Sequence, residues 1–122
     1  MKPAGNLSNI TFTAFDIETT GLTPVVDRIV EIGAVRFRGD EIIDTFEAFV
    51  NPGVPISSGA AAVNGITDDM VRGKPAIEEV LPRFIDFVGQ GIPVAHHAPF
   101  DVGFLAYEIS RLNLAIPDKP VL

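Results

Sequence analysis

The chain of 122 residues contains no cysteine, and only nine of its residues are lysine or arginine. Without cysteine it has no disulfide framework, no thiolate metal ligand and no cysteine nucleophile. It also lacks an apolar run near the roughly 18 residues of a membrane span, and its first residues lack the apolar core of a signal peptide. These absences predict a cytoplasmic protein with no membrane attachment.

Acidic residues outnumber basic ones by 16 to nine, which gives a formal net charge of −7. Neutralising the phosphates of duplex nucleic acid requires clustered lysine and arginine, whereas the basic residues here are scattered. If a nucleic acid is the substrate, bound cations must offset the carboxylates, and a partner or a further segment must supply most of the binding surface. The hydrophobic content of 47% predicts one folded domain with a single core.

The most informative stretch runs from residue 15 to residue 21 and places Asp16 and Glu18 at the end of an otherwise apolar strand. Side chains alternate along a strand, so these two point to the same side, about 7 Å apart. Such a pair can share one hard cation. The alternative is that each carboxylate is a turn cap or a solvated surface group, as is common near strand ends.

Hydrophobic patterning predicts three strands in the first half of the chain. Residues 10–15 are β-branched and aromatic, residues 29–37 begin as a run that is apolar on both faces, and residues 42–50 alternate apolar with polar side chains. A tight turn at 38–41 joins the last two, so the three strands are expected to form an antiparallel meander. Ser57 or Ser58 is expected to cap a short helix, and Thr67 a second short turn.

Two longer helices and a fourth strand are predicted in the second half. Pro75 suits a first helical position, and apolar residues at spacings of three and four then continue to a glycine stop at residue 89. A short strand at 92–96 is followed by a helix with Pro99 in its first turn. The apolar face of that helix is predicted to carry Val102, Leu105, Ile109 and Leu112, flanked by Phe100 and Phe104. The strand, helix, strand order places the fourth strand parallel to the first through a right-handed crossover, in a mixed α/β sheet with flanking helices.

Asp101 falls in the first turn of the last helix, directly beyond the fourth strand. Taken alone, it is a favourable partner of the helix dipole. However, sites in such sheets form beyond the carboxyl ends of the strands, where Asp16 and Glu18 also lie. Three converging carboxylates raise one another's pKa values unless cations bind, and without a Cys or His cluster the cations expected are Mg²⁺ or Mn²⁺.

Four blocks of sequence carry a resemblance to a known family: FDIETTGL (15–22), DRIVEIGAV (27–35), NGITDDMV (64–71) and VAHHAPFDVGFL (94–105). In order and spacing they resemble the DEDD superfamily of 3′-to-5′ exonucleases. In particular, they are similar to the proofreading exonuclease of bacterial DNA polymerase III, either the epsilon subunit or the inserted domain of the Gram-positive replicative polymerase. The resemblance runs from about residue 10 to residue 122 and implies a ribonuclease H-like fold.

The resemblance also implies roles for individual residues. It implies three catalytic metal ligands that hold two Mg²⁺ or Mn²⁺ ions in a two-metal mechanism: Asp16, Glu18 and Asp101. It implies six residues that bind the terminal nucleotide: Thr19, Thr20, Gly21, Leu22, His96 and Phe100. Stacking a base on such a surface contributes about 1 to 3 kcal/mol without reading sequence, which suits an enzyme that excises any terminal nucleotide.

Two features depart from the family pattern. His97 stands where the family often has Asn, and the third block of the family, a histidine followed five residues later by a fourth aspartate, has no counterpart after His97. A role for His96 or His97 as the general base is the less favoured explanation. We expect instead that residues 9–122 are the N-terminal portion of a longer exonuclease domain, preceded by a flexible leader at 1–8 and cut before a fifth strand. The exposed strand edge then predicts self-association.

The favoured hypothesis is a 3′-to-5′ exonuclease that releases nucleoside 5′-monophosphates from a single-stranded 3′ end of DNA, in association with a DNA polymerase. One alternative is an exoribonuclease on the same scaffold, because contacts to a 2′-hydroxyl cannot be read from the sequence. The other is a catalytically inert module that binds nucleic acid or a protein partner, which only the missing third block supports.

Overall fold

The computed structural model describes residues 9–115 and 121–122. The leader predicted at residues 1–8 lies outside this part of the chain. The elements are, in order, β1 (Thr11–Thr19), β2 (Ile29–Arg38), β3 (Glu41–Phe49), α2 (Ser58–Asn64), α3 (Asp68–Val71), α4 (Ile77–Val88), β4 (Ile92–Ala95) and α5 (Ala98–Arg111).

The four strands form one sheet in the order β3-β2-β1-β4. β1, β2 and β3 pair antiparallel, and β4 pairs parallel to β1. The predicted meander and crossover are therefore confirmed. β1 carries Asp16 and Glu18 near its end, as predicted, and these two residues pair with Gly33 and Glu31 on β2.

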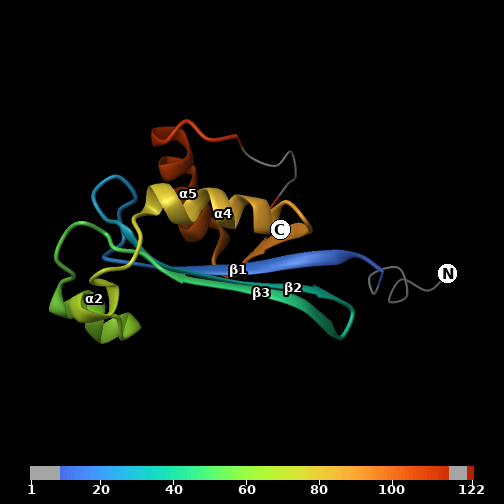
Figure 1. Cartoon of the computed structure of the whole chain (residues 1–122), viewed down its shortest axis with the longest axis horizontal. Coiled ribbons are helices and arrows are strands. Elements are labelled where there is room, and N and C mark those ends of the chain that lie inside the picture. Colours follow the sequence, from blue (N-terminus) through green and yellow to red (C-terminus); the bar gives the residue numbers. More distant parts are fainter. Residues whose placement is uncertain (1–8, 116–120) are drawn as a thin grey trace.

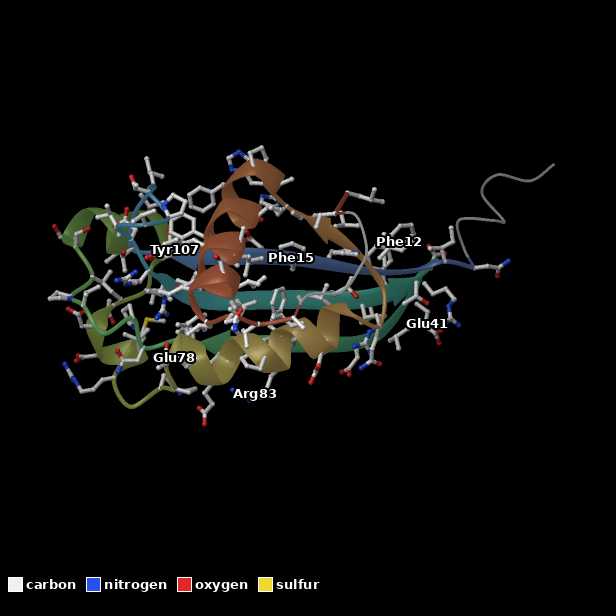
Figure 2. The ribbon with its side chains drawn as sticks, turned by 90° about the horizontal axis from the view of Figure 1, so that it is seen from above. Phe12, Phe15, Glu41, Glu78, Arg83 and Tyr107 are labelled. Atoms are coloured by element: carbon white, nitrogen blue, oxygen red, sulfur yellow. The ribbon has the colours of Figure 1, made fainter. Side chains whose placement is uncertain are left out.

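Helices α4 and α5 lie on the same face of the sheet, and α2 lies at one end of the opposite face (Figure 1). Viewed from above, α5 crosses the sheet beside Phe15 and α4 runs along the β3 side of the sheet (Figure 2). Phe15 and Ile17 of β1 are buried in this core against Phe84 of α4 and Phe104 of α5. Because side chains alternate along β1, Asp16 and Glu18 point to the other face.

Two details of the helices differ from the prediction. Pro75 is not the first residue of α4, which begins at Ile77 with Ala76 as its N-cap. Val102 does not belong to the core face of α5 but is exposed, whereas Phe104, predicted on its flank, is buried. The buried face of α5 includes the charged residues Asp101 and Glu108. A prediction from hydrophobic periodicity assigns charged residues to the exposed face, so it placed the buried face of this helix wrongly.

The short helices follow their capping signals in part. The hydroxyl of Ser57 caps α2 by accepting a hydrogen bond from the Ala60 backbone N–H at 3.1 Å, as predicted. Thr67 occupies the N-cap position of α3, but its side chain makes no capping hydrogen bond. None of the helices in the described part of the chain combines the length and the apolar character needed to cross a membrane.

The entry into β4 depends on a close approach between two backbone segments. A Cβ atom at Gly91 would lie 2.6 Å from Oγ1 of Thr13 and 3.1 Å from the carbonyl carbon of Phe12. Both Gly91 and Thr13 are buried. Only glycine lets the chain pass this close to β1 and begin the parallel pairing of β4.

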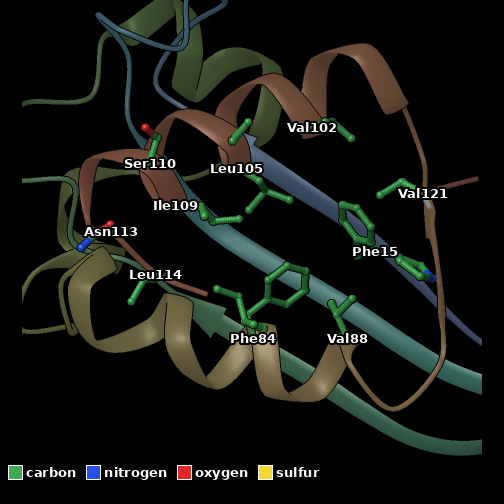
Figure 3. Close-up of a pocket in the computed structure, with 13 residues that line it drawn as sticks. Phe15, Phe84, Val88, Val102, Leu105, Ile109, Ser110, Asn113, Leu114 and Val121 are labelled. Carbon is green, nitrogen blue, oxygen red and sulfur yellow. The ribbon is translucent and has the colours of Figure 1, made fainter. Parts of the chain in front are cut away.

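The outer edge of β4 also carries backbone pairing. The Leu122 N–H donates to the Pro93 carbonyl at 2.9 Å, and the Ala95 N–H donates to the Leu122 carbonyl at 3.0 Å. Beside this edge, an apolar cavity of about 370 Å³ lies between α4 and α5. Phe15, Phe84 and Leu105 point into it (Figure 3). Among the described residues that line this cavity none is acidic or basic, so these residues offer no group for acid, base or metal chemistry.

Candidate active site

The first carboxylates of the site come from the end of β1. Asp16 is exposed and Glu18 is half-buried, whereas Phe15 and Ile17, which precede them, are in the core. The strand pairs with β2 in one register through Glu18, and the register shifts between Glu18 and Thr19. The alternation predicted from the sequence therefore places both carboxylates on the face opposite to α4 and α5.

The third carboxylate comes from the start of α5. The chain leaves β4 with the His96 N–H donating to the Phe15 carbonyl at 3.0 Å, and α5 begins two residues later. Asp101 is completely buried. Its Oδ2 accepts a hydrogen bond from the His97 backbone N–H at 3.1 Å, while its Oδ1 is buried without a partner among the described residues.

The charges of these three side chains act on one another. Burial raises the pKa of the Glu18 carboxyl, the charges of Asp16 and Asp101 raise that pKa further, and His96 lowers it. Burial also raises the pKa of the Asp101 carboxyl. The backbone hydrogen bond from His97 opposes that shift, and the charge of Asp16 adds to it. The predicted convergence of the three carboxylates is thus seen in their electrostatics as well as in their positions.

Further carboxylates lie beside the site on the same face of the sheet. Glu31 of β2 is the cross-strand partner of Glu18. Burial raises the pKa of the Glu31 carboxyl, and the charges of Glu47, Glu18 and Asp16 add to the shift. The negative field therefore extends across β1, β2 and β3. Sequence analysis assigned no role to Glu31, although the antiparallel register of the meander was enough to place it opposite Glu18.

The turn after β1 forms another wall of the site. The Thr20 N–H donates to the Arg28 carbonyl at 2.8 Å, and the Arg28 N–H donates to the Thr20 hydroxyl at 3.0 Å. From the other side, the amide of Asn64 donates to the Thr19 carbonyl at 3.0 Å. Leu22, at the tip of the turn, is 83% exposed. An apolar side chain this exposed is available to contact a ligand.

These segments enclose a single cavity of about 580 Å³. All nine residues predicted from the sequence line it: Asp16, Glu18, Thr19, Thr20, Gly21, Leu22, His96, Phe100 and Asp101. His97, noted as a departure from the family pattern, also lines the cavity, and its ring stacks on that of Phe100 with centroids 5.8 Å apart.

The remaining wall comes from α2 and was missed by sequence analysis. Ser57, Gly59, Ala60, Val63 and Asn64 line the cavity opposite the turn after β1. Val63 is 88% exposed and faces the same space as Leu22. The only signal in the sequence was the Asn64-Gly65-Ile66 block, which carried the family resemblance but no assigned role.

The side chains fit a divalent cation by their chemistry. The buried Oδ1 of Asp101 needs a positive or hydrogen-bonding partner, and the pKa values of Glu18 and Asp101 are raised first by burial and then by the neighbouring carboxylates. Within residues 9–115 and 121–122, however, no group of three or more His, Asp or Glu side chains is arranged to hold a metal ion. The oxygen donors are present, but they do not form a closed ligand set in this conformation.

A mixed sheet of this strand order with flanking helices matches the ribonuclease H-like fold of exonucleases. The chain belongs to the exonuclease family of RNase T, which matches residues 13–122 and falls within the DEDD class of 3′-to-5′ exonucleases. The resemblance found in the sequence is therefore confirmed. Members of this family generally use divalent metal ions.

Curated relatives carry the name DNA polymerase III PolC-type. The protein of Caldanaerobacter subterraneus subsp. tengcongensis is 50% identical over 105 residues, which is 86% of this chain and 8% of that protein. The protein of Listeria monocytogenes serovar 1/2a is 50% identical over 116 residues, which is 95% of this chain and 8% of that protein. The chain thus spans less than a tenth of the length of these relatives.

Solved structures confirm the fold. A product-bound structure of exonuclease I superposes with a TM-score of 0.81 at 20% identity and covers 93% of this chain and 30% of that chain. Exonuclease X in complex with 5′ overhanging duplex DNA superposes with a TM-score of 0.65 at 33% identity and covers 91% of this chain and 58% of that chain.

Proposed function

We propose that the chain is a 3′-to-5′ exonuclease of the proofreading type, which hydrolyses the terminal phosphodiester bond of DNA and releases nucleoside 5′-monophosphates. The observation that carries the proposal is the buried Oδ1 of Asp101, which has no hydrogen-bond partner among the described residues; Asp101 lines one cavity together with Asp16 and Glu18. A buried carboxylate oxygen without a partner is costly to a fold, so a site that retains one is a functional candidate.

Asp16, Glu18 and Asp101 are the residues that would hold two Mg²⁺ or Mn²⁺ ions. Their donors are all hard oxygens, which these ions prefer, and the chain has no cysteine to favour zinc. When bound, such ions supply an activated water and neutralise the charge that develops on the leaving 3′ oxygen. They also offset the negative field in which the three carboxylates would otherwise repel a phosphate.

The residues proposed to bind the terminal nucleotide surround these carboxylates. Thr19, Thr20 and Gly21 provide the backbone of the turn, while Leu22 and Phe100 provide apolar surface for a base. His96 follows β4 directly and is exposed at the same cavity. Contacts of this kind accept any base, as excision of mismatched and matched ends requires.

A DNA polymerase is the proposed partner. The named relatives are polymerases of the PolC type, and this chain matches a short stretch of each of them. Because its net charge is −7, the chain is expected to bind DNA weakly on its own. A polymerase that holds the DNA and presents the 3′ end would supply the binding energy that the chain lacks. We place this activity in the cytoplasm, on a single-stranded 3′ end.

The test is excision of a 3′-labelled DNA oligonucleotide with Mg²⁺ or Mn²⁺ by the protein that carries this sequence. Asp16→Ala should abolish release of the nucleoside monophosphate. Asp69→Asn is the matched control, because Asp69 is exposed and pairs with Arg72 away from the cavity. Retained excision in Asp16→Ala would remove the proposed role of this residue.

Two comparisons separate the alternatives. An RNA oligonucleotide of the same sequence, degraded faster than the DNA, would favour the exoribonuclease hypothesis. Calorimetric titration with Mn²⁺ tests the inert module, since a domain without a working site should show no binding above background at any accessible pH.

A further inference from the structure

The turn that forms one wall of the cavity belongs to an exposed loop. Residues 20–28 connect β1 to β2, and three apolar side chains of this loop, Leu22, Val25 and Val26, are 83%, 62% and 72% exposed. None of these three belongs to a buried hydrophobic cluster of the described residues. The conformation of the turn must therefore be fixed by polar contacts.

Those contacts converge on the carboxylate of Asp27. The Thr23 backbone N–H donates to its Oδ2 at 2.9 Å, and the Thr20 hydroxyl donates to its Oδ1 at 3.2 Å. The Asp27 backbone N–H donates back to the Thr23 carbonyl at 2.7 Å. Hydrogen bonds to a charged acceptor are stronger than neutral ones, so one carboxylate holds the turn at two points.

Gly21 packs directly on the same carboxylate. A Cβ atom at Gly21 would lie 2.5 Å from Cγ and from both oxygens of Asp27. No side chain atom tolerates that distance. The carboxylate of Asp27 therefore requires that Gly21 have no side chain. Gly21 lines the cavity, whereas Asp27 is not among the described residues that line it.

We propose that Asp27 is a positioning residue for the exonuclease reaction, which holds Thr20, Gly21 and Leu22 in the shape that receives the terminal nucleotide. This inference rests on the proposed function. Among the described residues, Asp27 makes no hydrogen bond or ion pair with the three carboxylates of the site, and it acts only through the turn. Loss of such a contact weakens nucleotide binding in the ground state and the transition state alike, which raises KM and leaves kcat nearly unchanged.

The first test is steady-state excision of a 3′-labelled DNA oligonucleotide by Asp27→Ala and Asp27→Asn in the protein that carries this sequence. Asp27→Ala should raise KM by at least about tenfold with kcat within about twofold of wild type, because it removes both hydrogen bonds of the carboxylate to the turn and the loss of one charge-assisted hydrogen bond already accounts for about tenfold. Asn retains an oxygen for the Thr23 N–H and an NH₂ group for the Thr20 hydroxyl, so Asp27→Asn should recover most of the loss. Asp69→Ala is the control and should match wild type in both constants.

The second test uses the contact between Gly21 and Asp27. Gly21→Ala alone should raise KM at least as much as Asp27→Ala, because its methyl group displaces the carboxylate. In the Asp27→Ala background the same change should add little, since the obstructing atoms are gone. Fully additive effects of the two substitutions would overturn the inference, as would a KM for Asp27→Ala equal to that of wild type.

A readout independent of catalysis keeps the two proposals separate. Hydrogen exchange at the Thr23 amide, which Asp27 protects, should accelerate in Asp27→Ala and remain slow in Asp69→Ala. If wild type degrades no DNA but this acceleration is seen, the proposed function fails while the anchoring of the turn stands. If wild type degrades DNA and exchange at Thr23 is unchanged, only the role of Asp27 is refuted.

Discussion

Replacing Asp101 by Asn should make the metal-free protein more stable and the metal-loaded protein less stable than wild type. Asp101 is completely buried, one of its oxygens has no partner among the described residues, and its pKa is raised above the ordinary value of 3.8. A carboxyl whose pKa is raised by folding binds more protons in the folded state. Stability therefore falls as pH rises from about the ordinary pKa through the raised one.

The size of the stability difference between wild type and Asp101→Asn follows from the hydrogen bonds that each side chain leaves unmade. A buried polar group without a partner costs about 1 to 3 kcal/mol, and Asn removes the charge while keeping an oxygen for the His97 N–H. We expect a net gain of about 1 kcal/mol above pH 7 without metal, equivalent to an increase of about 4 °C in Tm for a domain of this size. With Mn²⁺ at 100 times its Kd, wild type should gain about 2.7 kcal/mol and Asp101→Asn almost nothing.

The assay is thermal unfolding followed by circular dichroism, at pH 5 and pH 7.5, with and without Mn²⁺. The order of the two Tm values should invert when metal is added at pH 7.5, and the metal-free difference should shrink at pH 5. Asp69→Asn should follow wild type throughout. Equal stabilisation of wild type and Asp101→Asn by Mn²⁺ would refute the assignment of Asp101 as a ligand.

Two further predictions concern the scaffold and the rim of the site. Gly91→Ala should lower the free energy of unfolding by about 1 to 3 kcal/mol, measured by urea unfolding, because the added methyl group would lie 2.6 Å from Thr13 Oγ1. Adding Thr13→Ala to this variant should recover part of the loss. Additive losses from the two substitutions would contradict the steric explanation. Leu22→Ala should leave the urea midpoint unchanged, since Leu22 is 83% exposed, but should weaken binding of a 3′ terminal nucleotide by about tenfold, measured by calorimetry with a nucleoside 5′-monophosphate. A lowered midpoint with unchanged binding would assign Leu22 to the fold instead.

The sheet could be predicted because its signals are local. β-branched and aromatic residues with a period of two define β1 and β3, and a tight turn joins β2 to β3. The shared face of Asp16 and Glu18 needs only the alternation of a strand. The strand, helix, strand order then predicted that Asp101, which lies about 80 residues further along the chain, meets them at the same edge of the sheet. The family resemblance implied the same three residues.

The face of α5 and the α2 wall could not be predicted from local pattern. Asp101 and Glu108 are buried in α5, whereas a pattern-based prediction assigns charged residues to the solvent. Such a prediction therefore places Val102 on the buried face, although Val102 is exposed. Glu108 tolerates burial because Arg111 donates a hydrogen bond to it at 2.6 Å. The position of Val63 across from Leu22 depends on how α2 docks under the sheet, which no short-range signal specifies.

The carboxylates that spread over β1, β2 and β3 also affect how a polyanion approaches the protein. Asp16, Glu18, Glu31 and Glu47 are acidic neighbours on three adjacent strands, so this face of the sheet repels a polyanion. For most nucleic-acid enzymes, added monovalent salt slows encounter, because it screens an attraction. Here the same screening, over about 8 Å at physiological ionic strength, should speed up the encounter with DNA. The negative charge of these side chains therefore favours binding of the divalent ions before binding of the DNA strand.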